Sequence, residues 1–107
     1  MLIIMLIYLY MEKNNRLKNS KQMERHFKGI ANYRRIDILL ILDKEEDITL
    51  DQLTEILKGD FRTISEHTRR LAHAGLLNKN YMGRTVLHSL SPYGKQFVKF
   101  IKTFQHS

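Results

Sequence analysis

The sequence contains no cysteine, and this absence excludes several kinds of chemistry at once. Without a thiol, the chain forms no disulfide, holds no metal through a thiolate and has no cysteine nucleophile. The absence also agrees with a reducing compartment, so we expect a cytoplasmic protein. Internal repeats, glycine-rich phosphate loops and low-complexity tracts are missing too. What remains is one folded domain, because 107 residues are too few for two separate hydrophobic cores.

Acidic residues are missing from the C-terminal part of the chain. No Asp or Glu follows Glu66, although residues 67–107 contain seven Lys or Arg. Residues 43–66 show the reverse, with eight acidic residues against three basic ones, and residues 1–42 hold eight basic against three acidic. This pattern predicts one basic and one acidic surface, and the basic one would attract phosphate or anionic lipid.

A catalytic set is also missing. Ser65 and His67 lie two residues apart on a predicted helix and therefore point to different sides, so they form no dyad. We expect no enzyme activity. None of the five histidines pairs at i, i+4 with a second ligand type, so we expect no metal and no cofactor. These histidines are His26, His67, His73, His88 and His106. No small-molecule ligand can be identified from the sequence.

The chain opens with an apolar run of eleven residues, MLIIMLIYLYM. As a helix it spans roughly 16 Å, about half of a hydrocarbon core, so it does not cross a membrane. Three interpretations stay open: a helix or strand that packs on the core or on a second copy, a translation start further on at Met11 or Met23, or a membrane-surface anchor. The anchor would be assisted by Lys13, Arg16 and Lys18. We assign residues 1–20 to this run and a polar linker, and residues 21–107 to the domain.

Four helices are predicted next. Met23, Phe27 and Ile30 recur at helical spacing, and Asn32 can cap a second helix whose run from Ile38 to Leu42 marks the buried centre. A third helix starts near Thr49. The fourth covers residues 61–74 and is capped by Asp60, after a short turn in which Gly59 is expected to take a left-handed conformation. Two short helices joined by such a turn are typical of a helix-turn-helix.

Two β-like runs and a last helix complete the pattern. LLNKNYM and TVLHSL are separated by Gly83 and Arg84, which predicts a hairpin. Ser91 can cap the last helix, with Pro92 at its first position. The fold class is therefore mainly α with a small β-hairpin, in the order α-α-α-α-β-β-α: a winged helix-turn-helix whose wing covers residues 78–86.

Three segments carry a resemblance to a known family. HFKGIANYRRIDILLIL, ISEHTRRLAHAGLL and GRTVLHSLSPYG resemble the opening, recognition-helix and wing segments of ArsR-like winged helix-turn-helix transcriptional regulators. The resemblance covers about residues 22–104, and it implies double-stranded DNA as partner and a homodimer formed through terminal helices. Where the family usually has leucine, this chain has Thr68, which either weakens a core contact or places a hydroxyl near the backbone. The residues that its metal sensors use are not present.

The geometry of a recognition helix assigns roles along residues 61–74. Its N-terminal turn meets base edges, so we expect Arg62 to bind guanine, and Thr63 and Ser65 to touch bases or phosphates. Arg69 and Arg70 lie further along and are expected to reach phosphates.

Two residues of the same helix keep two interpretations. Glu66 either accepts a hydrogen bond from cytosine or pairs with a neighbouring arginine. His67 lies beside the apolar stripe, where a hydrogen-bonded packing role is favoured over a DNA contact.

The wing and the last helix supply the remaining expected contacts. Lys79, Tyr81 and Arg84 surround the wing tip, where Arg84 can enter a minor groove or hold a phosphate. The last helix carries an aromatic stripe that either completes the core or forms the dimer interface; its expected interface residues are Phe97, Phe100, Ile101 and Phe104.

The function that the sequence predicts is sequence-specific DNA binding in transcription regulation. The alternative is a winged helix that binds another protein instead of DNA, through its acidic edge at residues 43–60 or the N-terminal apolar run.

Overall fold

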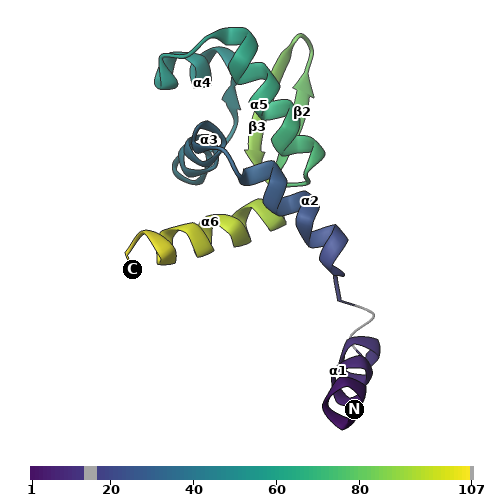
Figure 1. Ribbon diagram of the computed structural model, residues 1–107. Helices are drawn as coiled ribbons and strands as arrows, with labels where there is room; N and C mark the ends of the chain where they lie inside the picture. Colours follow the sequence, from purple (N-terminus) through teal and green to yellow (C-terminus); the bar gives the residue numbers. More distant parts are fainter. Residues whose placement is uncertain (14–16, 107) are drawn as a thin grey trace.

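The computed structural model describes residues 1–13 and 17–106. Within these residues, helices and strands follow in the order α1 (Leu2–Lys13), α2 (Ser20–Ile30), α3 (Tyr33–Lys44), β1 (Ile48–Thr49), α4 (Leu50–Leu57), α5 (Phe61–His73), β2 (Leu77–Met82), β3 (Thr85–Leu90) and α6 (Pro92–Gln105). Figure 1 shows α3, α4 and α5 gathered beside the hairpin, with α6 below them and α1 standing apart. The mainly helical class, the helix-turn-helix and the wing are confirmed.

The predicted helix starts are confirmed by their caps. The side chains of Asn32, Thr49, Asp60 and Ser91 each accept a hydrogen bond from a backbone N–H in the first turn of the following helix. Such caps satisfy donors that the first turn leaves unpaired, which is why they can be recognised from sequence. Residue 20 already belongs to α2, one position before the predicted domain boundary, because Asn19 caps that helix.

One turn prediction was wrong. The left-handed residue between α4 and α5 is Lys58, with φ of 50°, and Gly59 takes an ordinary conformation. The space around Gly59 explains the glycine differently, since a Cβ there would lie 3.0 Å from the side chain of Ile64.

The sheet contains a strand that the sequence did not reveal. β1 pairs antiparallel with β3, opposite His88 and Leu87, so the strand order is β1-β3-β2. Two residues are too short for a readable alternation. β2 and β3 form the expected hairpin, with Gly83 at φ of 65° in its turn.

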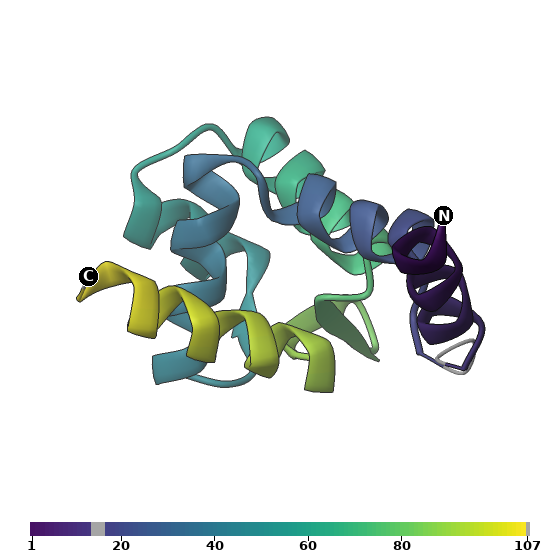
Figure 2. The same cartoon turned by 60° about the horizontal axis from the view of Figure 1, so that its bottom comes forward.

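The core lies where α3 crosses the other elements. Ile38, Leu39 and Leu42 are buried, as predicted. In Figure 2, α6 crosses α3, and α2 runs along α5. The helix predicted from Met23, Phe27 and Ile30 is present as α2, and it buries Ile30 with His26 and leaves Met23 and Phe27 exposed.

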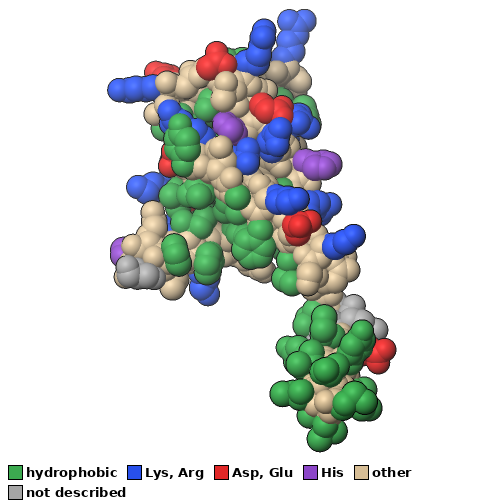
Figure 3. All heavy atoms as spheres, viewed as in Figure 1, with side chains coloured by type: hydrophobic (Ala, Val, Ile, Leu, Met, Phe, Trp, Pro, Cys, Tyr) green, Lys and Arg blue, Asp and Glu red, His purple; other side chains and the backbone are tan. Residues whose placement is uncertain are grey.

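The N-terminal run forms a helix, and it does not pack on the core. Its residues from Met1 to Met11 are between 52% and 96% exposed. Figure 3 shows apolar side chains on all visible sides of α1. Of the expected linker, residues 14–16, including Arg16 of the proposed anchor, lie outside the described residues. No helix in the described part of the chain is long and apolar enough to span a membrane.

Candidate nucleic-acid interface

Helix α5 and the hairpin form a concave surface, which we call the wing cavity. Its volume is about 440 Å³, and it is lined from α5 by Phe61, Ser65 and Thr68 and from the hairpin by Lys79, Tyr81, Arg84, Thr85, Val86 and His88, with Thr49, Leu50 and Asp51 at its edge. The sequence prediction thus names four residues that the structure brings together, one from the recognition helix and three from the wing. Burial and the charge of Arg69 lower the pKa of Lys79.

The first turn of α5 is exposed, but its hydroxyl group is already engaged. Asp60 accepts hydrogen bonds from the backbone N–H and the hydroxyl of Thr63, both at 3.0 Å, and these bonds lower the pKa of its carboxyl. Arg62, next to it, is exposed and makes no ion pair among the described residues. This arginine is free to reach a base edge, whereas Thr63 must leave Asp60 to do so.

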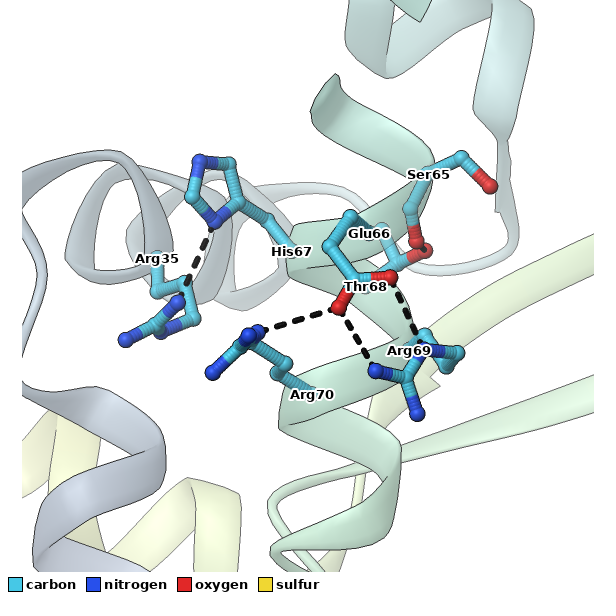
Figure 4. Close-up of polar contacts among 7 residues, drawn as sticks. All are labelled: Arg35, Ser65, Glu66, His67, Thr68, Arg69 and Arg70. Carbon is cyan, nitrogen blue, oxygen red and sulfur yellow. Dashed lines mark hydrogen bonds and ion pairs between the residues drawn. The ribbon is translucent and has the colours of Figure 1, made fainter. Parts of the chain in front are cut away.

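Glu66 lies between two arginines. It accepts hydrogen bonds from Nε and Nη2 of Arg69, at 2.8 and 2.6 Å, and from Nε of Arg70 at 3.1 Å. Figure 4 shows the carboxylate pointing between the two guanidinium groups. These bonds, with that of Arg69 the largest contribution, lower the pKa of Glu66 to about 2. Its pairing with arginine is therefore confirmed, and a contact with cytosine stays a prediction.

Two predictions about the buried side of α5 are settled by hydrogen bonds. Nη1 of Arg35 donates to Nδ1 of His67 at 3.3 Å, so His67 is a hydrogen-bonded packing residue, as favoured. Burial, followed by Arg35, lowers the pKa of His67 and keeps its ring a neutral acceptor. Thr68 is buried, and its hydroxyl donates to the carbonyl of Ser65 at 2.8 Å, so the hydroxyl lies near the backbone.

Arg69 and Arg70 face a second concavity, on the other flank of α5. It has a volume of about 390 Å³ between α2, α3 and α5, and its lining is Arg25, Lys28, Gly29, Arg35, Arg69, Arg70, His73 and Ala74. We call it the basic hollow. Sequence reasoning missed Arg35. The sequence does contain a signal for it: Arg35 lies on the same helical stripe as the apolar residues Ile38, Leu39 and Leu42, and is the one charged residue among these four.

The aromatic stripe of α6 divides into two parts. Phe97 and Ile101 pack against the core, whereas Phe100 and Phe104 are 59% and 68% exposed and stack on each other at 5.9 Å. Phe27 on α2 meets Phe97 edge to face at 5.3 Å. Figure 3 shows apolar side chains over α6.

The described residues contain no group of three or more His, Asp or Glu side chains that could hold a metal ion. The fold and the α5–hairpin surface instead define the class of winged helix-turn-helix DNA-binding domains.

Several solved structures of this class are similar to the chain. HlyU from Vibrio cholerae is similar with a TM-score of 0.74 and 27% identity, over 85% of this chain and 99% of HlyU. Mb0332 from Mycobacterium bovis, a homodimeric winged helix-turn-helix DNA-binding domain and a possible ArsR-family regulator, has a TM-score of 0.73 and 20% identity over 80% of each chain. The transcriptional repressor PagR of Bacillus anthracis has a TM-score of 0.69 and 23% identity, over 76% of this chain and 93% of PagR.

No protein-family model matches the chain, and no curated protein does. The structural neighbours share the winged helix fold that the sequence predicts, and they include transcriptional regulators and possible ArsR-family members, which agrees with the resemblance.

Proposed function

We propose that this chain is a sequence-specific transcriptional regulator of a prokaryotic cytoplasm, which inserts α5 into the major groove and lays the β2–β3 wing on the backbone or in the minor groove. The observation that carries the proposal is the wing cavity, where Ser65 of the recognition helix faces Lys79 and Arg84 of the hairpin. A concave surface with hydroxyl groups on the helix side and cations on the hairpin side suits the curved, phosphate-lined edge of a duplex. DNA occupancy then regulates access of the polymerase.

The roles within α5 follow from position and pairing. Arg62 in the first turn reads a base edge, because it is exposed and has no carboxylate partner among the described residues. Arg69 and Arg70 bind phosphates. Glu66 holds both arginines in one orientation, which reduces the freedom that they lose on binding.

A second copy of the chain completes the regulator. Phe100 and Phe104 on α6, together with Phe27 on α2, form an exposed aromatic face, and next to it lies an apolar cavity of about 170 Å³ lined by Phe27, Gln96, Phe97 and Phe100. An exposed face of this kind is the usual site of a two-fold interface. The two α5 helices would then enter successive major grooves about 34 Å apart, on an inverted repeat.

Selection of bound sequences from a random DNA pool tests the function. A two-fold symmetric motif is the expected result. Arg69→Ala should weaken binding to every sequence and reduce the slope of log K against log salt by about 0.9, which corresponds to one phosphate contact. Arg62→Ala should in addition relax the sequence preference. Lys44→Ala removes the same charge from the exposed end of α3 and is the matched control.

The protein-binding alternative gives the opposite outcome. If the pool yields no motif, and if Arg62→Ala and Arg69→Ala both bind DNA like the parent, α5 is not a recognition helix. The acidic edge at residues 43–60 then becomes the candidate surface for a protein partner.

We also propose a second role, a membrane-surface anchor formed by α1. A helix that is exposed and apolar on all sides cannot be covered by one flat groove, whereas lipid tails surround it completely. Basic residues follow it closely, with Lys18 and Lys21 at the start of the domain, and these attract anionic headgroups. A length of about 18 Å allows insertion into one leaflet only.

Flotation with vesicles tests the anchor. The full chain should float with vesicles rich in phosphatidylglycerol and less with pure phosphatidylcholine, and Leu6→Asp with Leu9→Asp should abolish flotation. A chain that begins at Met11 is the control. If the full chain stays at the bottom and forms larger oligomers than the control, α1 binds a second copy instead.

A further inference from the structure

The basic hollow brings cationic side chains together from three helices. α2 supplies Arg25 and Lys28, α3 supplies Arg35, and α5 supplies Arg69 and Arg70. Like charges repel, so five such groups around one concavity of about 390 Å³ raise the free energy of the empty site. That volume lies in the range of small-ligand sites.

The carboxylates near the hollow are too few to balance it. Glu66 is shared by Arg69 and Arg70, so one negative charge serves two positive ones. Glu24 lies 3.9 Å from Lys28, and both side chains are largely exposed. Arg25 makes no ion pair among the described residues, which leaves an excess of positive charge at the opening.

Arg35 is the unusual member of the set. It is only 9% exposed, although it carries a full charge. One of its Nη atoms donates to His67, and its Nε has no hydrogen-bond partner within residues 1–13 and 17–106. No carboxylate lies within ion-pair distance in the same part of the chain. A buried charge without a counter-charge is costly, so such a group is normally paired or binds a ligand.

The position of the Arg35 side chain and its lowered pKa both indicate a nearby positive charge that no counter-charge cancels. Figure 4 shows Arg35 and Arg70 projecting into the same space from α3 and α5. Burial, and then the charge of Arg70, lower the pKa of Arg35, and the charge of Glu66 opposes them without cancelling them. A planar guanidinium binds a tetrahedral oxyanion through two parallel N–H bonds, which a lysine cannot do.

We propose that the basic hollow is a binding site for a phosphate group, anchored by Arg35 and closed by Arg25, Lys28 and Arg70. The phosphate belongs either to the DNA backbone beside the recognition site or to a free phosphorylated molecule, and both offer the same oxyanion. The DNA source rests on the proposed function, since Arg69 lines the hollow and belongs to α5, the proposed recognition helix. The free source does not depend on DNA binding.

Titration of the full chain with inorganic phosphate, at constant ionic strength and without DNA, tests the site. We expect saturable shifts of the Arg35 side-chain NMR signals, and at least tenfold weaker binding in Arg35→Gln. Arg25→Gln with Lys28→Gln changes only exposed side chains and should weaken binding by a similar factor even if Arg35→Gln folds poorly. Lys44→Gln is the control and should bind phosphate like the parent.

A salt titration of DNA affinity distinguishes the two sources. If the double variant Arg25→Gln, Lys28→Gln reduces the slope of log K against log salt by about 0.9 or more, a backbone phosphate occupies the hollow. If phosphate binding is lost in the variants while this slope is unchanged, the ligand is a free phosphorylated molecule. Absence of saturable phosphate binding together with an unchanged slope overturns the proposal. Failure of DNA binding in the parent overturns the proposed function alone, because the phosphate titration contains no DNA.

Discussion

The two concavities beside α5 are similar in volume and differ in the elements that supply their cations. The wing cavity, about 440 Å³, takes its cations from an exposed hairpin and contains hydroxyl groups and Asp51. The basic hollow, about 390 Å³, takes its cations from three packed helices and includes the buried Arg35. One helix therefore borders a concavity with mixed polar groups on one side and a concavity lined mainly by positive charges on the other. If α5 is the recognition helix, its arginines face different surroundings and would serve different contacts.

The largest expected effect comes from separating the helices around the basic hollow. A Cβ on Gly29 would lie 2.2 Å from the Cβ of Ala74, so Gly29→Val forces α2 away from α5. We expect a loss of about 1–3 kcal/mol in the free energy of unfolding and weaker phosphate binding, with the wing cavity intact. Urea denaturation measures the loss. Gly83→Ala on the wing is the counterpart: a Cβ there meets nothing within 4 Å, so its cost, about 1–2 kcal/mol, comes from the positive φ alone.

Replacing the buried cation sharpens the comparison further. Arg35→Met fills a similar space without a charge, and the free energy of unfolding should stay the same or rise by about 2 kcal/mol, while phosphate binding is lost. Urea denaturation and the phosphate titration check both parts. A clear destabilisation would mean that Arg35 stabilises the fold through His67 and that the hollow is only structural.

Burial lowers the pKa of two histidines, His67, which accepts a hydrogen bond from Arg35, and His88, which lines the wing cavity, so stability should depend on pH. Burial is the largest cause that lowers the pKa of His67; Arg35, Arg70 and Arg34 lower it further, and Glu66 raises it. Burial is also the largest cause that lowers the pKa of His88; Lys79 lowers it further, and the hydrogen bond to Ile48 raises it.

Both pKa values in the folded chain lie below 6.5, the value in the unfolded chain. Below about pH 6.5 the unfolded chain therefore binds more protons than the folded chain. The free energy of unfolding should therefore be constant above pH 6.5 and fall as the pH drops below it. His67→Gln and His88→Gln should each reduce this slope, measured by urea denaturation at several pH values. A slope that is unchanged in both variants contradicts the assignment.

Only a small effect on stability is expected for Glu66→Gln. It frees Arg69 and Arg70, and the midpoint of thermal unfolding should shift little, because exposed ion pairs contribute little. DNA affinity should become less sequence-specific. In the parent, the pKa of about 2 keeps the pair with both arginines intact well below pH 4, which an NMR titration of the carboxyl carbon can follow.

The features that sequence reasoning found are those fixed by neighbouring residues. The caps Asn32, Thr49, Asp60 and Ser91 act on a backbone two or three residues away, so their positions could be predicted. By the same logic Gly59 was expected to be left-handed. Packing against Ile64 decides its role instead, and Lys58 takes that conformation.

The features that it missed depend on distant parts of the chain. β1 exists because two residues meet β3, about forty positions away, and Arg35 gains its significance from helices on both sides. The wing residues could be predicted because a hairpin tip is local. That Ser65 would share a cavity with Lys79 and Arg84, and that Arg69 and Arg70 would lie on another flank, follows only from the fold.

The start of α6 is fastened to the end of α5 by three contacts within a few residues. The hydroxyl of Ser91 donates to the carbonyl of Gly75 at 2.6 Å, and its N–H donates to that of Leu76 at 3.2 Å. A Cβ on Gly94 would lie 1.9 Å from the same Leu76 oxygen, so the backbones touch with no side chain between them. These contacts leave no space for α6 to move closer to the end of α5. In the proposed dimer, a tilt of α6 against the second subunit would turn α5 with it, so this contact would set the spacing of the two α5 helices at a point far from their tips.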